Sequence, residues 1–366
     1  MTTHVATTST QQAPPLAQEG VWGWCRARLF SSPLNAILTV LVVWLLLMTV
    51  PAMVEWLFIR ANFSATTAQE CRASGGACWA FIAEKHRLIL FGIYPYDEQW
   101  RPLLATLILI AVIVCSCVRW FWRPMLGLFW AVALTAVAVL MWGGVLGLSY
   151  VENSRWGGLP LTLILATFGI AFAFPFGLLL ALGRRSDMAA VKALCVVYIE
   201  LIRGVPLISL LFMSSVMLPL FLPEGFSIDK LLRAQIAIIL FAAAYIAETV
   251  RGGLQAIPKG QYEAANSLGL NYWQQMGKII LPQALKVVIP PLVGIFISLF
   301  KDTSLVVIIG IFDLTQAAKV ALSDAAWRGF SAEAYLFIAL IYFVFCFSIS
   351  RYSQALERQL KTDRER

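Results

Sequence analysis

Charged side chains are scarce in this sequence. Only 13% of its 366 residues are Asp, Glu, Lys or Arg, against about 25% in a typical soluble globular protein. Hydrophobic residues make up 60% of the chain, and its mean hydropathy is +0.78. This balance excludes an ordinary soluble domain and predicts an all-α integral membrane protein in contact with membrane lipid. The net charge of +8 then fits loops at the inner membrane surface, and we expect no nucleic-acid partner.

Motifs of enzyme chemistry are also missing. The chain has no G-x-x-x-x-G-K-[ST] loop to hold a phosphate, no H-E-x-x-H, no C-x-x-C, and only two histidines. Each of these motifs places ligating or phosphate-binding groups at a fixed spacing. We therefore expect no catalytic residue, no metal site and no cofactor in this subunit.

Long apolar runs dominate what is present. We expect about eight transmembrane helices, at roughly 35–58, 102–118, 125–148, 160–182, 206–222, 234–250, 287–312 and 333–350. Most of these runs reach the 17–25 residues that a spanning helix needs. The fifth run is short, and Lys301-Asp302 interrupts the seventh.

The basic residues orient these spans. If both termini are cytoplasmic, the inner loops hold 17 Lys and Arg residues against 7 acidic ones, and the rest of the chain has no such excess. The positive-inside rule favours this topology. The first residues lack the basic region and apolar core of a signal peptide, so we expect no cleavage. The predicted parts are a disordered cytoplasmic tail (1–33), three N-terminal spans (34–157) with an outer loop (59–101), a main transmembrane domain (158–355) with a polar loop (251–286), and a cytoplasmic tail (356–366).

Two of the seven cysteines lie in a polar loop. Cys71 and Cys78 occur in AQECRASGGACWAF with six residues between them. If this loop lies outside the cytoplasm, we expect a disulfide there. The other five cysteines lie in or beside apolar runs, and we interpret them as small buried hydrophobic residues.

The polar loop 251–286 is too polar to span a membrane. Gln261 to Leu268 favours a helix, Gly269 is suited to end it, and Asn271 is a plausible N-cap for a second short helix. The pattern therefore predicts two short helices joined by a glycine bend at the cytoplasmic face. Its small residues favour contact with a protein over the alternative of a lipid-surface helix, which would be basic with a bulky apolar stripe.

Seven residues of this loop match the sequence pattern of a known protein family. The pattern EAA-x3-G-x9-I-x-LP resembles the EAA loop of ABC importer permeases, with Glu263, Ala264, Ala265, Gly269, Ile279, Leu281 and Pro282 at its fixed positions. In that family the loop is a coupling helix that inserts into a cleft of the ATPase subunit. The resemblance implies a five-helix permease core at the C-terminal side, and a subunit without its own nucleotide site.

Flanking segments narrow the resemblance. IELIRGVPL (199–207), AYIAETVRGG (244–253), IPKGQYEAA (257–265) and KDTSL (301–305) are similar to the polar amino-acid uptake permeases of the histidine/glutamine group. The three extra N-terminal spans resemble those of general L-amino-acid permeases. This implies alternating-access import across a bacterial inner membrane. The implied partners are an ABC ATPase dimer that binds ATP and Mg²⁺, a second homologous permease subunit and a periplasmic amino-acid-binding protein.

Two groups of polar residues are candidates for the transport path. Charges inside a membrane span usually face a cavity or pair with each other. We interpret Lys301, Asp302, Thr303 and Ser304 as the substrate pathway, where the charged pair would match an amino-acid zwitterion. They equally fit a mutually neutral pair at a helix end. The second group is a candidate gate and helix start, and its members are Glu200, Arg203, Gly204, Pro206 and Glu248. These residues could instead form ordinary ion pairs at the membrane interface.

Two other function classes remain at this point. An ion-coupled secondary amino-acid transporter would use Lys301 and Asp302 as a substrate or proton site and would need no ATPase. A membrane scaffold without transport activity would leave these intramembrane charges unexplained.

Overall fold

The computed structural model describes residues 20–122, 125–225 and 227–365. Most of the expected N-terminal tail, residues 1–19, lies outside the described residues. Within the described ranges the secondary structure is helical, with two isolated β-bridges and no strand. The chain divides into two compact units, residues 1–80 and 81–366.

The first unit begins with two helices, α1 (Val21–Arg28) and α2 (Pro33–Val54). Helix α1 lies within the stretch expected to be a disordered tail, and it carries exposed Trp22 and Trp24. Ser32 caps α2 by accepting the backbone N–H of Asn35 at 3.2 Å, and Pro33 takes the first helical position.

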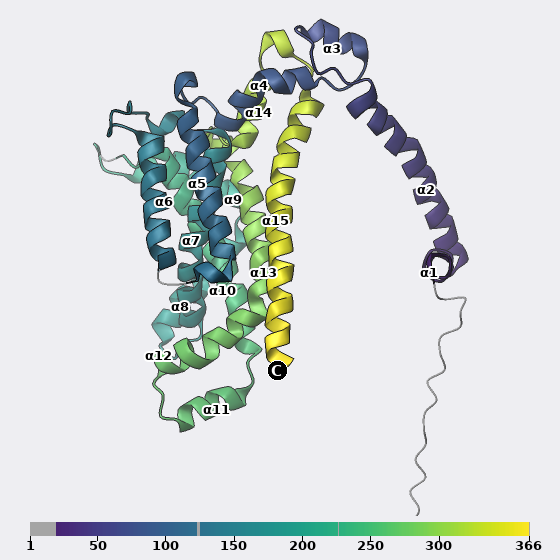
Figure 1. Cartoon of the computed structure of the whole chain (residues 1–366). Helices are drawn as coiled ribbons and strands as arrows, with labels where there is room; N and C mark the ends of the chain where they lie inside the picture. Colours follow the sequence, from purple (N-terminus) through teal and green to yellow (C-terminus); the bar gives the residue numbers. More distant parts are fainter. Residues whose placement is uncertain (1–19, 123–124, 226, 366) are drawn as a thin grey trace, which may run out of the picture. The chain divides into compact units, whose positions relative to one another are not determined.

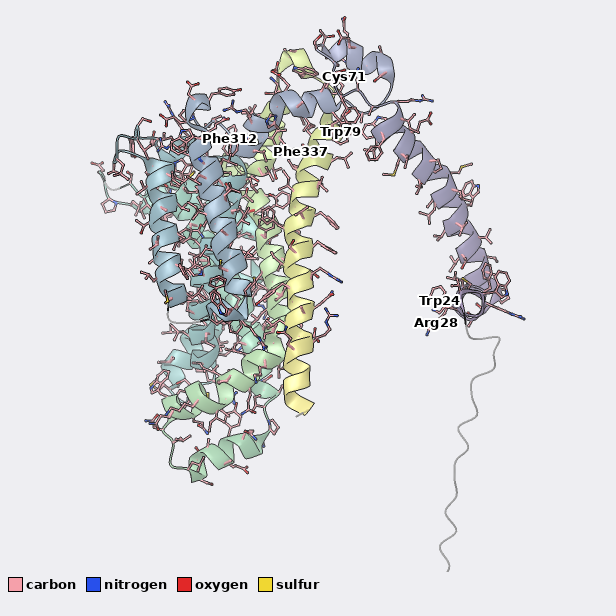
Figure 2. The ribbon with its side chains drawn as sticks, viewed as in Figure 1. Trp24, Arg28, Cys71, Trp79, Phe312 and Phe337 are labelled. Carbon is pink, nitrogen blue, oxygen red and sulfur yellow. A yellow bond between two sulfur atoms is a disulfide. The ribbon has the colours of Figure 1, made fainter. Side chains whose placement is uncertain are left out.

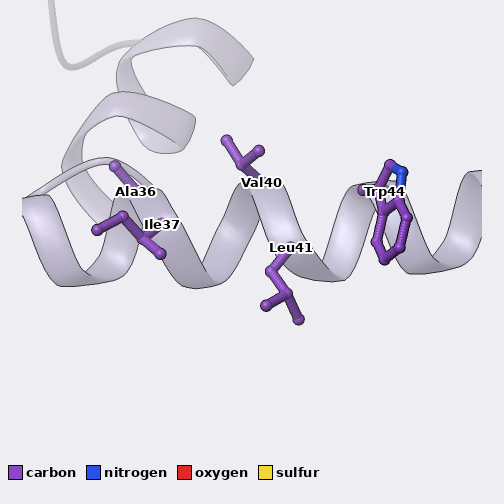
Figure 3. A pocket seen from close by; sticks show the side chains of 5 residues that line it. All are labelled: Ala36, Ile37, Val40, Leu41 and Trp44. Carbon is purple, nitrogen blue, oxygen red and sulfur yellow. The ribbon is translucent and has the colours of Figure 1, made fainter.

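Helix α2 is apolar along its whole length. With the π-helical turn Glu55–Ile59 it forms a 27-residue segment that is long and apolar enough to span a membrane. Figure 3 shows five side chains that line a shallow hollow on it: Ala36, Ile37, Val40, Leu41 and Trp44. This hollow has no charged group, so it offers nothing that would bind the ends of an amino acid.

A disulfide closes the loop that follows. Cys71, in the short helix α3 (Ala68–Ser74), is bonded to Cys78, with Cα atoms 5.5 Å apart (Figure 2). Gly75 ends α3 in the left-handed conformation at φ 65°. The indole of Trp79 donates a hydrogen bond of 2.8 Å to the carbonyl of Leu57. The predicted outer loop is therefore a cross-linked, partly helical element rather than an open connection.

The second unit is a helical bundle (Figure 1). Helix α4 (Trp79–Phe91) begins at the end of the first unit. The remaining helices are α5 (Trp100–Cys117), α6 (Met125–Trp142), α7 (Gly158–Arg184), α8 (Ala189–Gly204), α9 (Leu207–Phe212), α10 (Lys230–Gln255), α11 (Lys259–Ser267), α12 (Tyr272–Gln275), α13 (Leu281–Asp302), α14 (Leu314–Leu322) and α15 (Ser331–Glu365).

The number of spans agrees with the prediction. In the described chain seven helical segments are long and apolar enough to cross a membrane, and a bent pair makes an eighth. The pair consists of α8 and the helical segment Leu207–Phe221, and the chain bends by 102° between them. The predicted fifth span, 206–222, is therefore only the second half of this bent pair, and residues 189–204, expected to lie outside a span, form α8. The break arises because Pro206 has no N–H and forces Val205 into an extended conformation (φ −109°, ψ 132°).

Two other boundaries differ from those expected. Lys301-Asp302 does not interrupt a span: α13 runs through both residues and continues as the 3₁₀ segment Thr303–Ile309. Helix α15 extends through the predicted C-terminal tail to Glu365. Its 35 residues correspond to about 52 Å, which exceeds the hydrocarbon thickness of about 30 Å.

Helix α10 lies at the centre of the core. A Cβ atom on Gly177 of α7 would come within 2.8 Å of the Ala243 carbonyl oxygen, and one on Gly253 within 2.9 Å of the Ala284 carbonyl oxygen. Glycine at these two positions therefore allows α7 and α13 to approach α10 closely. Small residues serve this purpose in membrane helix packing.

A buried arginine fixes α5 to α6. Arg101 is 1% exposed, and its Nε donates to the carbonyl of Leu140 at 2.7 Å while Nη1 donates to that of Ser149 at 3.0 Å. The same guanidinium pairs with Glu98. Two of the three N-terminal spans are thus held together by charge-assisted hydrogen bonds to the end of α6.

Buried polar groups also lie where α7 and α14 begin. Asp313 caps α14 by accepting the N–H groups of Thr315 (3.0 Å) and Gln316 (2.9 Å), and Thr162 of α7 accepts the N–H of Leu314 (3.1 Å). The N–H of Gly158 donates to the carbonyl of Phe312 at 2.8 Å. Burial raises the pKa of Asp313 to about 6.

Candidate coupling and translocation site

The polar stretch between α10 and α13 folds as two short helices joined by a glycine. Helix α11 ends where Gly269 takes the left-handed conformation at φ 69°. Asn271 then begins α12 in a capping box: it accepts the N–H of Gln274, and the Gln274 side chain accepts the N–H of Asn271. The bend predicted from the sequence is present. In Figure 1, α11 lies at the end of the bundle opposite to α14.

The motif residues of this element differ in exposure. Glu263, Ala264 and Gly269 are exposed, whereas Ala265 is fully buried. Ile279, in the π-helical turn Met276–Ile280, and Leu281, the first residue of α13, are half-buried, and Pro282 is exposed. The residues outside the motif include two large exposed side chains, Leu268 (73%) and Trp273 (69%). An exposed patch that combines a carboxylate with apolar groups is typical of a protein-docking surface.

A buried glutamine holds the two short helices together. Gln275 of α12 donates from Nε2 to the carbonyl of Tyr262 at 2.9 Å and to the Oδ1 of Asn266 at 3.3 Å. Gln275 is 7% exposed. A buried side chain that satisfies two acceptors fixes their relative position, so α11 and α12 form one unit.

A cluster of ion pairs joins α7, α8 and α10 near their C-terminal ends. Glu248 of α10 is its centre: Oε2 lies 2.9 Å from the Nε of Arg251, 3.2 Å from Arg184 and 3.8 Å from Arg203. Arg184 also pairs with Glu200 at 2.9 Å. The structure thus brings three predicted gate residues, Glu200, Arg203 and Glu248, into one cluster.

The other two predicted gate residues mark the bend beside this cluster. Gly204 is the last residue of α8, and Pro206 is the N-cap of α9. A Cβ atom on Gly204 would meet no atom within 4 Å. Pro206 therefore accounts for the bend, and Gly204 is not required there by close packing.

A cavity of about 370 Å³ lies between α10 and α13. The residues that line it are Phe241, Ala242, Tyr245, Pro291, Gly294, Ile295, Ser298, Leu299 and Asp302. Asp302 is its only charged residue. The ring of Tyr245 also lies 5.6 Å from the guanidinium carbon of Arg203, so Tyr245 contacts a member of the ion cluster as well as lining the cavity.

The four predicted pathway residues have different surroundings. Asp302 is half-buried and lines the cavity, whereas Lys301 is exposed. Thr303 is fully buried and donates its hydroxyl to the carbonyl of Phe300 at 2.7 Å, and Ser304 is half-buried. Within the described ranges, no salt bridge within 4.0 Å joins Lys301 to Asp302. Adjacent residues of a helix point in different directions, which explains this separation.

Comparison with known proteins identifies the family. The family model of binding-protein-dependent transport system inner membrane components matches residues 173–362. The chain is 53% identical over 345 residues to the inner membrane amino-acid ABC transporter permease protein YhdY of Escherichia coli (strain K12), covering 93% of each chain. It belongs to the amino-acid ABC transporter permeases.

Two further relatives support the same assignment. The chain is 41% identical to the glutamate/glutamine/aspartate/asparagine transport system permease protein BztC of Rhodobacter capsulatus, over 95% of this chain and 96% of that protein. The crystal structure of an amino acid ABC transporter with histidines aligns at 36% identity with a TM-score of 0.50, over 55% of this chain and 92% of that one. The solved permease thus corresponds to only part of the present chain.

Family membership settles the function class. The chain is a permease of an ABC importer in the bacterial inner membrane, as the EAA pattern predicted, with the permease core at its C-terminal side. The ion-coupled secondary transporter considered as an alternative is wrong, because the relatives are permease subunits of ATP-driven importers.

Four residues that were not predicted as site residues contact the ion cluster, the cavity or α11. They are Arg184, Arg185, Tyr245 and Tyr262. Arg184 completes the ion cluster, and Tyr245 lines the cavity. Arg185 and Tyr262 contact each other at 2.9 Å although 77 positions separate them. The consecutive arginines at the end of a predicted span were the available signal, but their partners depend on tertiary packing.

Proposed function

We propose that this permease couples import of polar L-amino acids to a partner ATPase through α11. The observation that carries this proposal is the exposure of Glu263 and Ala264, the first two residues of the EAA sequence, on a helix–glycine–helix element at one end of the bundle. ATP and Mg²⁺ would bind to an ABC ATPase dimer, with no nucleotide site in this subunit. Glu263, Ala264 and the adjacent Leu268 are exposed and available to that partner.

The remaining partners follow from the same proposal. A second homologous permease subunit would complete the membrane part, and a periplasmic binding protein would deliver the amino acid. This requires both termini to be cytoplasmic, which the excess of basic residues in the inner loops supports. For the substrate class we propose polar L-amino acids, since the name of BztC includes glutamate, glutamine, aspartate and asparagine.

The cavity between α10 and α13 would be part of the translocation path. Asp302 supplies a carboxylate that attracts the ammonium group of a zwitterion, and Lys301 an exposed cation one residue away. Thr303 and Ser304, which directly follow Asp302 in the chain, would belong to the same path. At the inner end, Glu200, Arg203 and Glu248, beside Gly204 and Pro206, would form the gate. Alternating access requires that ATP-bound and free states bind the partners differently.

Co-purification tests the docking part of this proposal. The complex with its ATPase would be isolated in detergent through a tag on this chain, as wild type and as Glu263→Lys. Lys278→Glu is the matched control, because it also reverses an exposed charge in the same loop but lies outside the motif. We expect Glu263→Lys to lose the ATPase while the control retains it. Equal amounts of ATPase with both variants would contradict the proposal.

A further inference from the structure

Two consecutive arginines at the end of α7 contact two different parts of the permease. Arg184 pairs with Glu200 and Glu248 in the ion cluster. Arg185 points to the element that contains the EAA sequence: its Nη1 donates to the hydroxyl of Tyr262 at 2.9 Å and to the carbonyl of Leu254 at 3.1 Å. Their Cα atoms are about 3.8 Å apart, as in any trans peptide.

Tyr262 connects α11 to the bundle. Its hydroxyl accepts from Arg185 and donates to the carbonyl of Leu254 at 3.0 Å. The guanidinium carbon of Arg185 also lies 5.4 Å from the tyrosine ring. Tyr262 directly precedes Glu263, the first residue of the EAA sequence.

On its other side, Tyr262 is fixed to α12. Its carbonyl accepts the hydrogen bond from the buried Gln275, which also binds Asn266. Because α11 and α12 form one unit, a displacement of their exposed face also displaces Tyr262. Its hydroxyl would then pull on Arg185 or release it.

The ion cluster leads from α7 to the cavity. Glu248 contacts both Arg184 and Arg203. Arg203 lies beside the ring of Tyr245, which lines the cavity together with Asp302. Side-chain contacts therefore lead from Tyr262 to Arg185, and from Arg184 to the cavity wall. The two arginines are consecutive residues of α7 and its C-cap, so the backbone joins the two sets of contacts.

We propose that Tyr262 and Arg185 are positioning residues that transmit movement of α11, through the end of α7, to the Glu248 cluster and the cavity. This rests on the proposed docking of the ATPase at α11. Neither residue touches substrate or nucleotide in this account. Their role is to tie ATP hydrolysis to reorientation of the path, so removal of the contact uncouples the two.

The test measures coupling rather than binding. The full complex with its ATPase and binding protein would be reconstituted in proteoliposomes, and uptake of radiolabelled L-glutamine and L-glutamate would be measured beside ATP hydrolysis. The variants are Tyr262→Phe, which keeps the ring and removes the hydroxyl, Arg185→Gln, and the double substitution. Tyr150→Phe, at an exposed tyrosine outside α11 and α12, is the control.

We expect Tyr262→Phe and Arg185→Gln to retain the ATPase and to hydrolyse ATP. The amino acid imported per ATP should fall at least about fivefold, the low end of typical coupling factors. The double variant should be no worse than either single one, since both remove the same contact. Tyr150→Phe should match wild type.

Three results would overturn the inference: a wild-type ratio in either single variant, additive losses in the double variant, or loss of the ATPase from the complex. The last would mean that the pair only maintains the fold of the loop. Failure of the docking proposal is distinguishable, because Glu263→Lys would then retain the ATPase.

Discussion

Arg184 and Glu248 form an ion pair of 3.2 Å between α7 and α10, 64 positions apart in the chain. Both side chains are about one-fifth exposed. Glu248 also accepts from Arg251 and lies near Arg203, so one carboxylate balances three guanidinium groups. Removal of its charge would leave these arginines facing one another with only Glu200 as an acidic neighbour.

Glu248→Gln should therefore destabilise the packing of α7, α8 and α10. Breaking a buried pair costs 3–5 kcal/mol, and partial exposure of this one reduces the expected loss to about 2 kcal/mol. Thermal unfolding of the purified permease in detergent measures it, with Glu224→Gln in an exposed loop as the control. If the two variants unfold at the same temperature, the cluster contributes little to stability.

Arg101→Met should separate α5 from the end of α6. The substitution removes the donors to Leu140 and Ser149 and leaves Glu98 without its partner. We expect a loss of about 3 kcal/mol, as for other broken buried charge pairs. Arg155→Met, at an exposed arginine, should change the unfolding temperature little. A stable Arg101→Met protein would show that the N-terminal spans are held mainly by apolar packing.

The stability of the permease should depend on the protonation of Asp313. Burial raises its folded-state pKa to about 6, above the unfolded value near 3.8. The folded state therefore binds the proton more tightly, and this contribution to stability is complete below about pH 3.8 and lost as the pH rises through about 6. Asp313→Asn should keep the helix cap and remove this pH dependence, which corresponds to about 3 kcal/mol.

Unfolding temperatures of wild type and Asp313→Asn, measured between pH 4 and pH 8, test this. The two curves should diverge between about pH 4 and pH 6, with the wild type becoming relatively less stable, and should run parallel above that. Curves that are parallel over the whole range would mean that Asp313 does not titrate in it.

Substitutions at the cavity test the proposed path. Asp302→Asn should lower uptake of L-glutamine by roughly tenfold or more, because a charge-assisted hydrogen bond is worth about 1.5–3 kcal/mol. Lys301→Met should also lower the uptake of L-glutamine. Both variants should retain the ATPase, since neither residue lies in α11. Near-normal uptake in both variants would place the substrate elsewhere.

The apolar spans could be predicted because hydrophobic length is a local property. The same holds for the Gly269 bend and the Asn271 cap, where the residue type alone sets the backbone conformation. Helix α8 was missed because its charged ends resemble a loop, and hydropathy does not show that Glu200 and Arg203 find partners on other helices.

The ion cluster and the contact of Tyr262 with Arg185 could not be predicted for a related reason. Each joins residues that are far apart in the chain, and neither follows a helical or strand period. The position of Asp302 in a cavity likewise depends on how α13 packs against α10. A sequence pattern identifies such residues as unusual, but their partners are set by tertiary packing.

ATP-driven uptake in proteoliposomes tests the central claim most directly. The chain would be reconstituted with its ATPase, second permease subunit and binding protein, and radiolabelled L-glutamine uptake would be followed with and without ATP and with an uncoupler. Our account predicts that uptake requires ATP and the binding protein and persists when the uncoupler is added. Uptake that continues without ATP and stops with the uncoupler would contradict it.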